Sequence, residues 1–183
     1  MKARLLLGVF LVLTCAAVNA QDRVQIFAGY SYARYSVYQI YSGPWTGYNF
    51  NGGLGSAAFR ITPHVSAEGE IGGAYGSNTG GQSYNFLTFM GGPRISGRSQ
   101  KITVYGHALF GAQRFTSNYS NGARSFAMVL GGGTDLWLRR SLGVRLAQVD
   151  ILLNGNSAAA QQGATGAGVR ANLRIATGIT FRF

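Results

Sequence analysis

The chain has 183 residues, the length of one ordinary domain, and it is rich in glycine (28 residues) and in aromatic side chains (13%). Only 11% of its residues are charged, whereas a soluble surface typically carries about 25–35% charged residues. The net charge is nevertheless +11, because 16 Lys and Arg outnumber 5 Asp and Glu. This composition disfavours a soluble helical domain and favours a chain of many strands.

Residues 1–20 have the pattern of a secretory signal peptide, with a basic start at Lys2 and Arg4, an apolar core and small residues before Gln21. We expect its removal to leave one domain over 21–183, with a net charge of +9 (+11 minus 2). Cys15, the only cysteine, lies in this leader, so we expect neither a disulfide nor a thiolate metal site in the mature domain. Lipoprotein processing at Cys15 is the alternative, although the preceding Thr is a poor match.

After the leader, apolar and polar residues alternate over eight segments, which is typical of strands with one apolar face. No later run has the ~18 apolar residues that a membrane helix needs. The predicted strands cover residues 23–35, 46–61, 64–76, 83–95, 102–115, 125–138, 142–153 and 169–183. Longer connections, expected at 36–45, 77–82, 116–124 and 154–166, alternate with short turns. This order predicts an all-β fold, an eight-stranded antiparallel up-and-down barrel without exposed edges.

Charge placement predicts which face of the barrel points outward. Glu68 and Glu70 lie on the phase opposite Ile71, and too few charges occupy that phase to solubilise an outer wall. A charge that faces the bilayer centre costs about 2–4 kcal/mol, so we predict a transmembrane barrel with paired charges inside. The expected lumen network consists of Glu68, Glu70, Arg94, His107, Asp135, Arg145 and Arg174. A soluble sandwich with scattered core aromatics is the alternative.

Aromatic side chains are expected to form two girdles at the membrane interfaces. The girdle near the long loops would contain Tyr30, Tyr32, Tyr48, Phe50, Tyr75 and Phe126. The girdle near the short turns would contain Trp137, Phe181 and Phe183.

Two strands depart from simple alternation. Strict alternation would point Gln148 and Asp150 toward lipid, so we predict a β-bulge near Ala147 that turns both inward. In residues 85–95 both phases are apolar, and we assign the outward phase as Leu87, Phe89, Gly91 and Ile95.

The leader, the strand count, the glycine-rich GGGTDLW segment and the terminal ITFRF resemble the small eight-stranded outer-membrane barrels of the OmpA/OmpX type over residues 21–183. The resemblance implies a monomer in outer-membrane lipids that the barrel-assembly machinery inserts. It also implies that Ile179, Phe181 and Phe183 form a C-terminal assembly signal. We expect no periplasmic peptidoglycan-binding domain after Phe183.

Catalytic and metal chemistry have weak support in the sequence. His64, Ser66 and Glu68 share one strand face, but alternate strand residues lie ~6.6–7 Å apart, beyond hydrogen-bond reach for short side chains. His107 has no second histidine or cysteine at ligand spacing, so we expect a lumen histidine without a metal. No cofactor is expected, and the dispersed basic residues argue against nucleic-acid binding and fit contacts with anionic lipid head groups.

The sequence therefore predicts an outer-membrane protein that is not an enzyme and has a structural or surface-interaction role. The four longer connections would be extracellular and would bind any host or envelope ligand. The main alternative is a narrow, porin-like conductance, and a lipid-modifying enzyme is less favoured.

Overall fold

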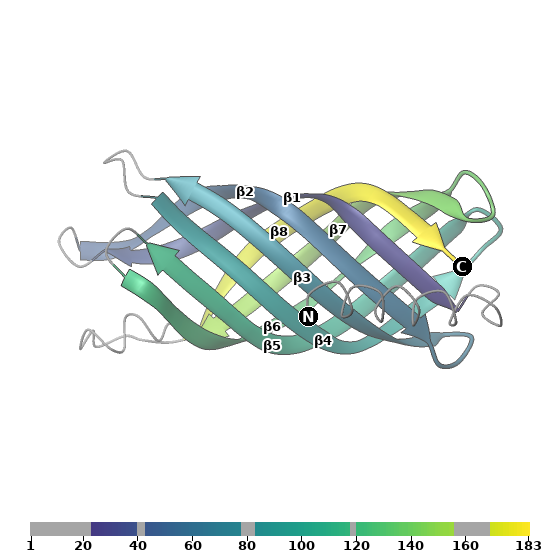
Figure 1. Cartoon of the computed structure of the whole chain (residues 1–183), viewed down its shortest axis with the longest axis horizontal. Coiled ribbons are helices and arrows are strands. Elements are labelled where there is room, and N and C mark those ends of the chain that lie inside the picture. Colours follow the sequence, from purple (N-terminus) through teal and green to yellow (C-terminus); the bar gives the residue numbers. More distant parts are fainter. Residues whose placement is uncertain (1–22, 40–42, 78–82, 118–119, 156–168) are drawn as a thin grey trace, which may run out of the picture.

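The computed structural model describes residues 23–39, 43–77, 83–117, 120–155 and 169–183, which excludes the predicted leader. The strands are β1 Val24–Gln39, β2 Gly43–Arg60, β3 Val65–Ser77, β4 Ser83–Arg98, β5 Ile102–Ser117, β6 Ser120–Trp137, β7 Leu142–Gly155 and β8 Val169–Arg182. Each strand pairs antiparallel with the next, and β8 pairs with β1, so the sheet closes on itself (Figure 1). The predicted eight-stranded up-and-down barrel is confirmed. Within the described ranges, no helix has the length and apolar character needed to cross a membrane.

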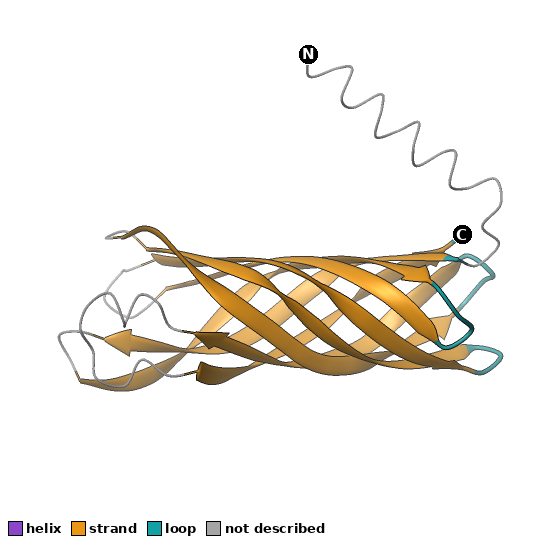
Figure 2. Cartoon of the chain, turned by 90° about the horizontal axis from the view of Figure 1, so that it is seen from below, coloured by secondary structure: helices purple, strands orange, loops and turns teal. Residues whose placement is uncertain are grey.

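The three short turns lie together at one end of the barrel, next to the C-terminus, and we call this the turn end (Figure 2). Backbone hydrogen bonds close each turn. In the β2–β3 turn the amides of Ile61 and Thr62 donate to the carbonyl of Val65 at 2.9 and 3.0 Å, and in the β6–β7 turn Leu138 donates to Leu142 at 3.0 Å. We call the opposite end of the barrel the loop end.

The strands continue further toward the loop end than the sequence predicts. β1 pairs with β2 through Ser36 and Val37, and β6 begins at Ser120. Most of the loops predicted at 36–45 and 116–124 are therefore strand, and those two predictions were wrong. Polar side chains did not end the ladders, because backbone groups make the cross-strand bonds. The other two predicted loops, 77–82 and 154–166, lie mainly outside the described residues.

Along these strands, apolar side chains lie on the outer face of the barrel wall and charged side chains point into the lumen. In β8, Leu173 and Ile175 are 48% and 42% exposed on the outer face, while Arg174 between them is 3% exposed and points into the lumen. β3 follows the same rule, with Ile71 exposed between inward-facing neighbours such as Glu70. A soluble barrel has the opposite arrangement, with its apolar phase inside.

The orientation predicted for β4 is confirmed. Leu87, Phe89 and Ile95 are exposed on the outer face, whereas Phe86 and Met90 are buried in the lumen. Both phases of this strand are apolar because one faces outward and the other packs inside the barrel.

The bulge predicted near Ala147 is also confirmed. The register of β7 shifts between Arg145 and Gln148 against β8. Leu146 and Ala147 are consecutive and both exposed, and Gln148 and Asp150 are therefore fully buried. Thr177 of β8 donates its hydroxyl to the Arg145 carbonyl at 2.8 Å, which gives that bulge carbonyl a partner.

The predicted aromatic girdles are correct in part. Tyr30, Tyr32, Tyr75, Phe126, Phe181 and Phe183 are exposed on the outer face. Phe50 and Trp137 are buried inside the barrel and Tyr48 packs against buried residues there, so these three assignments were wrong. The physical reason is that the lumen also takes aromatic side chains, including the buried rings of Tyr35 and Phe86.

Candidate functional site

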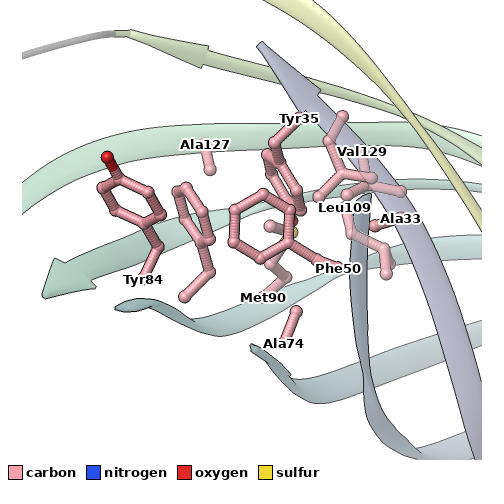
Figure 3. Close-up of a cluster of buried hydrophobic side chains, with 11 residues drawn as sticks. Ala33, Tyr35, Phe50, Ala74, Tyr84, Met90, Leu109, Ala127 and Val129 are labelled. Atoms are coloured by element: carbon pink, nitrogen blue, oxygen red, sulfur yellow. The ribbon is translucent and has the colours of Figure 1, made fainter. Parts of the chain in front are cut away.

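The lumen toward the loop end is filled by apolar side chains. The apolar cluster consists of Ala33, Tyr35, Phe50, Ala74, Tyr84, Phe86, Met90, Leu109, Ala127, Val129 and Leu152 (Figure 3). The ring of Phe86 stacks on Tyr35 with centroids 4.3 Å apart and meets Phe50 edge-on at 4.9 Å. Such stacked and edge-on ring contacts contribute stability in addition to that of apolar burial. Side chains from several strands thus cross the lumen at this level.

A small cavity separates the apolar cluster from the charged part of the lumen. It lies between Tyr35, Phe86, Thr88 and Arg174, and its volume is about 10 Å³. A cavity needs roughly 10–15 Å³ of volume to hold a single water. The cavity therefore has room for about one water and for no larger ligand.

Below the apolar cluster, charged side chains form a continuous chain of ion pairs. In contact order, the ion-pair chain runs Arg145, Asp135, Arg94, Glu68, His107, Asp150, Arg174, Glu70. Its N···O distances lie between 2.6 and 3.5 Å, and every member is at most 6% exposed. Cations and anions alternate along it, so each buried charge has an opposite partner, as burial requires.

His107 sits at the centre of the ion-pair chain. Its Nδ1 lies 2.9 Å from Glu68 Oε2, and its Nε2 lies 2.9 Å from Asp150 Oδ1. Both ring nitrogens can donate to a carboxylate only when the imidazole is protonated. The geometry therefore fits the imidazolium form, which gives the ion-pair chain four positive and four negative charges.

Neutral polar and aromatic groups complete the contacts of the ion-pair chain. Gln25 donates to Asp135 at 2.5 Å, and Gln148 donates to Asp150 at 2.8 Å and to Glu70 at 3.2 Å. The Tyr105 hydroxyl donates to Gln148 at 2.9 Å, and its ring lies 3.6 Å below the Arg94 guanidinium. Arg145 lies 3.9 Å over the ring of Phe27.

One glycine makes room for this network. Gly131 of β6 lies opposite Asp150 of β7, and a Cβ placed on it would come 2.1 Å from Asp150 Oδ1. Any side chain at this position would displace the carboxylate. The triple-glycine segment 131–133 thus relieves crowding in a narrow barrel.

The structure brings together all seven residues that the sequence proposed for the lumen. It adds Asp150. The sequence analysis predicted that this residue points inward, but did not include it in the network. It also adds Gln25, Tyr105 and Gln148, which the sequence analysis missed as network members. The signal for Gln25 was its place on the polar phase of the first predicted strand.

The residues that superficially resemble a hydrolase triad do not assemble. His64 is exposed in the β2–β3 turn, with Nδ1 3.3 Å from the Ser96 carbonyl oxygen. Glu68 instead contacts Arg94 and His107 inside the lumen. Within the described part of the chain, no group of three or more His, Cys, Asp or Glu side chains is arranged to hold a metal ion.

The proposed C-terminal signal lies on the outer wall. Ile179, Phe181 and Phe183 are 49%, 42% and 52% exposed on one face of β8. They continue the apolar stripe of Leu173 and Ile175 to the turn end.

No protein-family model matches the sequence, and no curated protein matches it. Among solved structures, Neisserial surface protein A aligns with a TM-score of 0.65 at 11% identity, over 87% of this chain and 97% of that one. The chain has the fold of the small eight-stranded outer-membrane barrels. The outer membrane protein OprG of Pseudomonas aeruginosa aligns with a TM-score of 0.55 at 10% identity, over 90% and 97% of the two chains. Ail, the attachment invasion locus protein of Yersinia pestis, aligns with a TM-score of 0.52 at 12% identity, over 89% of this chain and 99% of that one.

Proposed function

We propose that the protein is a non-conducting, non-enzymatic outer-membrane barrel with a structural or surface-interaction role. One observation carries the proposal, namely an apolar outer wall around a lumen that is filled with a charge-balanced ion-pair chain. The exposed Leu173, Ile175 and Ile179 on the outer phase of β8 would be unfavourable in water and favourable in lipid. The shared fold with bacterial outer-membrane proteins supports this location.

The filled lumen supports a non-conducting barrel. Toward the loop end, Phe50, Leu109 and Leu152 are completely buried in the apolar cluster. Toward the turn end, Arg94 of β4 reaches Gln25 of β1 and Asp135 of β6, and Arg145 of β7 lies over the ring of Phe27 of β1. Barrels of about eight strands have an interior just wide enough for such side chains. An ion that entered the lumen would have to displace side chains of both the apolar cluster and the ion-pair chain.

The loop end would carry any interaction with host, matrix or envelope ligands. Two structural neighbours are named as a surface protein and as an attachment protein, which is consistent with this role. We further propose that residues 1–20 direct export, that the barrel-assembly machinery inserts the chain as a monomer, and that Ile179, Phe181 and Phe183 are read during insertion. Truncation of these residues would then reduce assembly in cells without changing export.

Two measurements on refolded protein test the proposal. An environment-sensitive label on Leu173→Cys should be quenched by brominated lipids in vesicles, whereas the same label on Arg139→Cys in the turn should not. The residue pair is suitable because the only native cysteine, Cys15, lies in the predicted leader. The protein should also leave a planar bilayer electrically silent. A water-soluble monomer with an unquenched Leu173 label would refute the membrane role, and steady conductance would favour the narrow-channel alternative.

A further inference from the structure

Two arginines face each other on the outer wall of the barrel, in its loop half. Arg114 of β5 is the cross-strand partner of Arg124 of β6, and these two strands lie side by side in Figure 1. Both side chains are exposed, on the outer phases that also carry Phe110 and Phe126. Directly opposed residues have Cβ atoms about 4.5–5.5 Å apart. The two guanidinium groups can therefore reach a single ligand.

This arrangement places two positive charges where a sheet favours opposite ones. Like charges directly opposite each other on adjacent strands are destabilising. The chain has only five acidic residues. Glu68, Glu70, Asp135 and Asp150 are buried in the lumen, where the ion-pair chain holds them, and Asp22 precedes β1 in the sequence, outside the described residues. No carboxylate of the described residues therefore shares this outer face.

The level of the arginine pair on the wall indicates its surroundings. Arg114 lies twelve residues after Ile102, which begins β5 at the turn end and is 43% exposed. With a rise of about 3.4 Å per residue and a tilt of about 45°, Arg114 is roughly 29 Å above that edge, beyond an apolar band about 25 Å tall. Phe126, two residues nearer the turn end than Arg124, is 66% exposed and belongs to the aromatic girdle. The pair therefore lies just outside the girdle, at the level of the lipid head groups.

The chemistry of the pair suits a phosphate group. A guanidinium has five N–H donors in a planar fork and binds phosphate oxygens two at a time. Arg124 also has a contact within the protein, which five donors allow beside a ligand. Two arginines carry two positive charges, and a phosphomonoester carries about −1.5 to −2 at pH 7. A phosphodiester has one ionisable group fewer, so the charge match favours the monoester.

We propose that Arg114 and Arg124 together bind the head-group phosphate of a phosphomonoester lipid in the leaflet at the loop end of the barrel. The proposal rests on the membrane role given above, and it adds a lipid class and the two residues that recognise it. The acyl chains would lie against the exposed side chains beside and below the pair, which are Leu87 of β4, Phe110 and Phe126. A soluble phosphate gains nothing from this apolar wall, so the position of the pair selects a lipid.

The test measures which anionic lipid the mature protein retains in nanodiscs of phosphatidylcholine. The nanodiscs contain equal amounts of phosphatidic acid, a phosphomonoester, and phosphatidylglycerol, a phosphodiester. After a brief detergent extraction, mass spectrometry counts the lipids that remain bound. The paired variant is R114Q/R124Q. The matched control, R34Q/R139Q, removes the same charge from two exposed arginines, one in β1 and one in the β6–β7 turn, which are not cross-strand partners of each other.

Wild type and the control should retain phosphatidic acid in several-fold excess over phosphatidylglycerol. The second charge of the phosphomonoester meets a second arginine, which favours association by up to roughly five-fold. The paired variant should retain the two lipids within about two-fold of each other. R114Q alone should lose most of the excess, because one guanidinium no longer matches the charge of the monoester. Removal of a like-charge pair from an exposed face should leave refolding intact.

Three results would overturn the proposal, namely equal retention of both lipids by wild type, equal losses in the paired variant and the control, or an undiminished excess in R114Q. Displacement of phosphatidic acid by an equal concentration of glucose 1-phosphate would also overturn it, because the ligand would then be a soluble phosphate. Failure of wild type to enter nanodiscs would refute the membrane role itself.

Discussion

Ile175→Arg tests whether the outer wall faces lipid. Ile175 is 42% exposed, on the outer phase of β8 and six residues before Phe181 of the turn-end girdle. A strand rises about 3.4 Å per residue and tilts about 45° in such barrels, which places Ile175 roughly 14 Å from that girdle. The apolar band is about 25 Å tall, so this position is close to the bilayer centre, where an arginine costs about 2–4 kcal/mol.

The assay is equilibrium unfolding by guanidinium in phosphatidylcholine vesicles, followed by tryptophan fluorescence. Ile61→Arg is the control, because Ile61 is 65% exposed in the β2–β3 turn and an arginine near the interface costs only about 0–1 kcal/mol. The reasoning requires the difference between the two variants to exceed about 1 kcal/mol. If both variants unfold like wild type, the wall faces water, since an exposed Ile→Arg change on a soluble protein costs little.

The remaining predictions concern the interior. D135N leaves the two arginines that contact Asp135 without its charge, and it should lower the free energy of unfolding by about 3–5 kcal/mol; a loss under about 1 kcal/mol would contradict the ion-pair chain. F86A removes the central ring of the apolar cluster and should cost about 3–5 kcal/mol in the same assay, while bilayers stay silent because the charged level still fills the lumen. G111A places a Cβ 2.0 Å from the Phe89 carbonyl oxygen and should cost about 1–3 kcal/mol, whereas G69A, with open space around its Cβ, should unfold like wild type.

The fold could be predicted because its physical signals are local. Alternation with period two is visible in each strand, and the few acidic residues decide which phase is inside. The same logic located the bulge, since Gln148 and Asp150 would otherwise have faced lipid, and only one extra residue could turn both inward. These features depend on side-chain chemistry that the linear sequence displays.

The interior of the loop half could not be predicted in this way. Phe50 lies within β2, and Trp137 is the last residue of β6 at the turn end. Both are aromatic residues of strands, and girdle residues have the same description. Alternation alone gives no answer in residues 85–95, where both phases are apolar, and the buried ring of Phe86, which stacks on Tyr35, lies in that segment. The end of a strand is equally hard to predict from side-chain polarity, because the backbone ladder of β1 and β2 continues through polar residues such as Ser36.

The pairing order of the ion-pair chain depends on closure of the barrel. Sequence identified candidate charges, but it could not show that Arg174 would contact Glu70, 104 residues earlier, or that His107 would join Glu68 to Asp150. Such partners are set by strand tilt and register around the whole barrel. No spacing rule along the chain contains that information.

The ion-pair chain has a consequence for the order of assembly. Its members are distributed over β3, β4, β5, β6, β7 and β8, and Gln25 of β1 joins at Asp135. A half-open sheet in the bilayer would present carboxylates and guanidinium groups to hydrocarbon before their partners had arrived, which is strongly unfavourable. Membrane entry and closure of the β1–β8 seam should therefore occur as one concerted event, and a stable intermediate with separated hairpins should not accumulate in lipid.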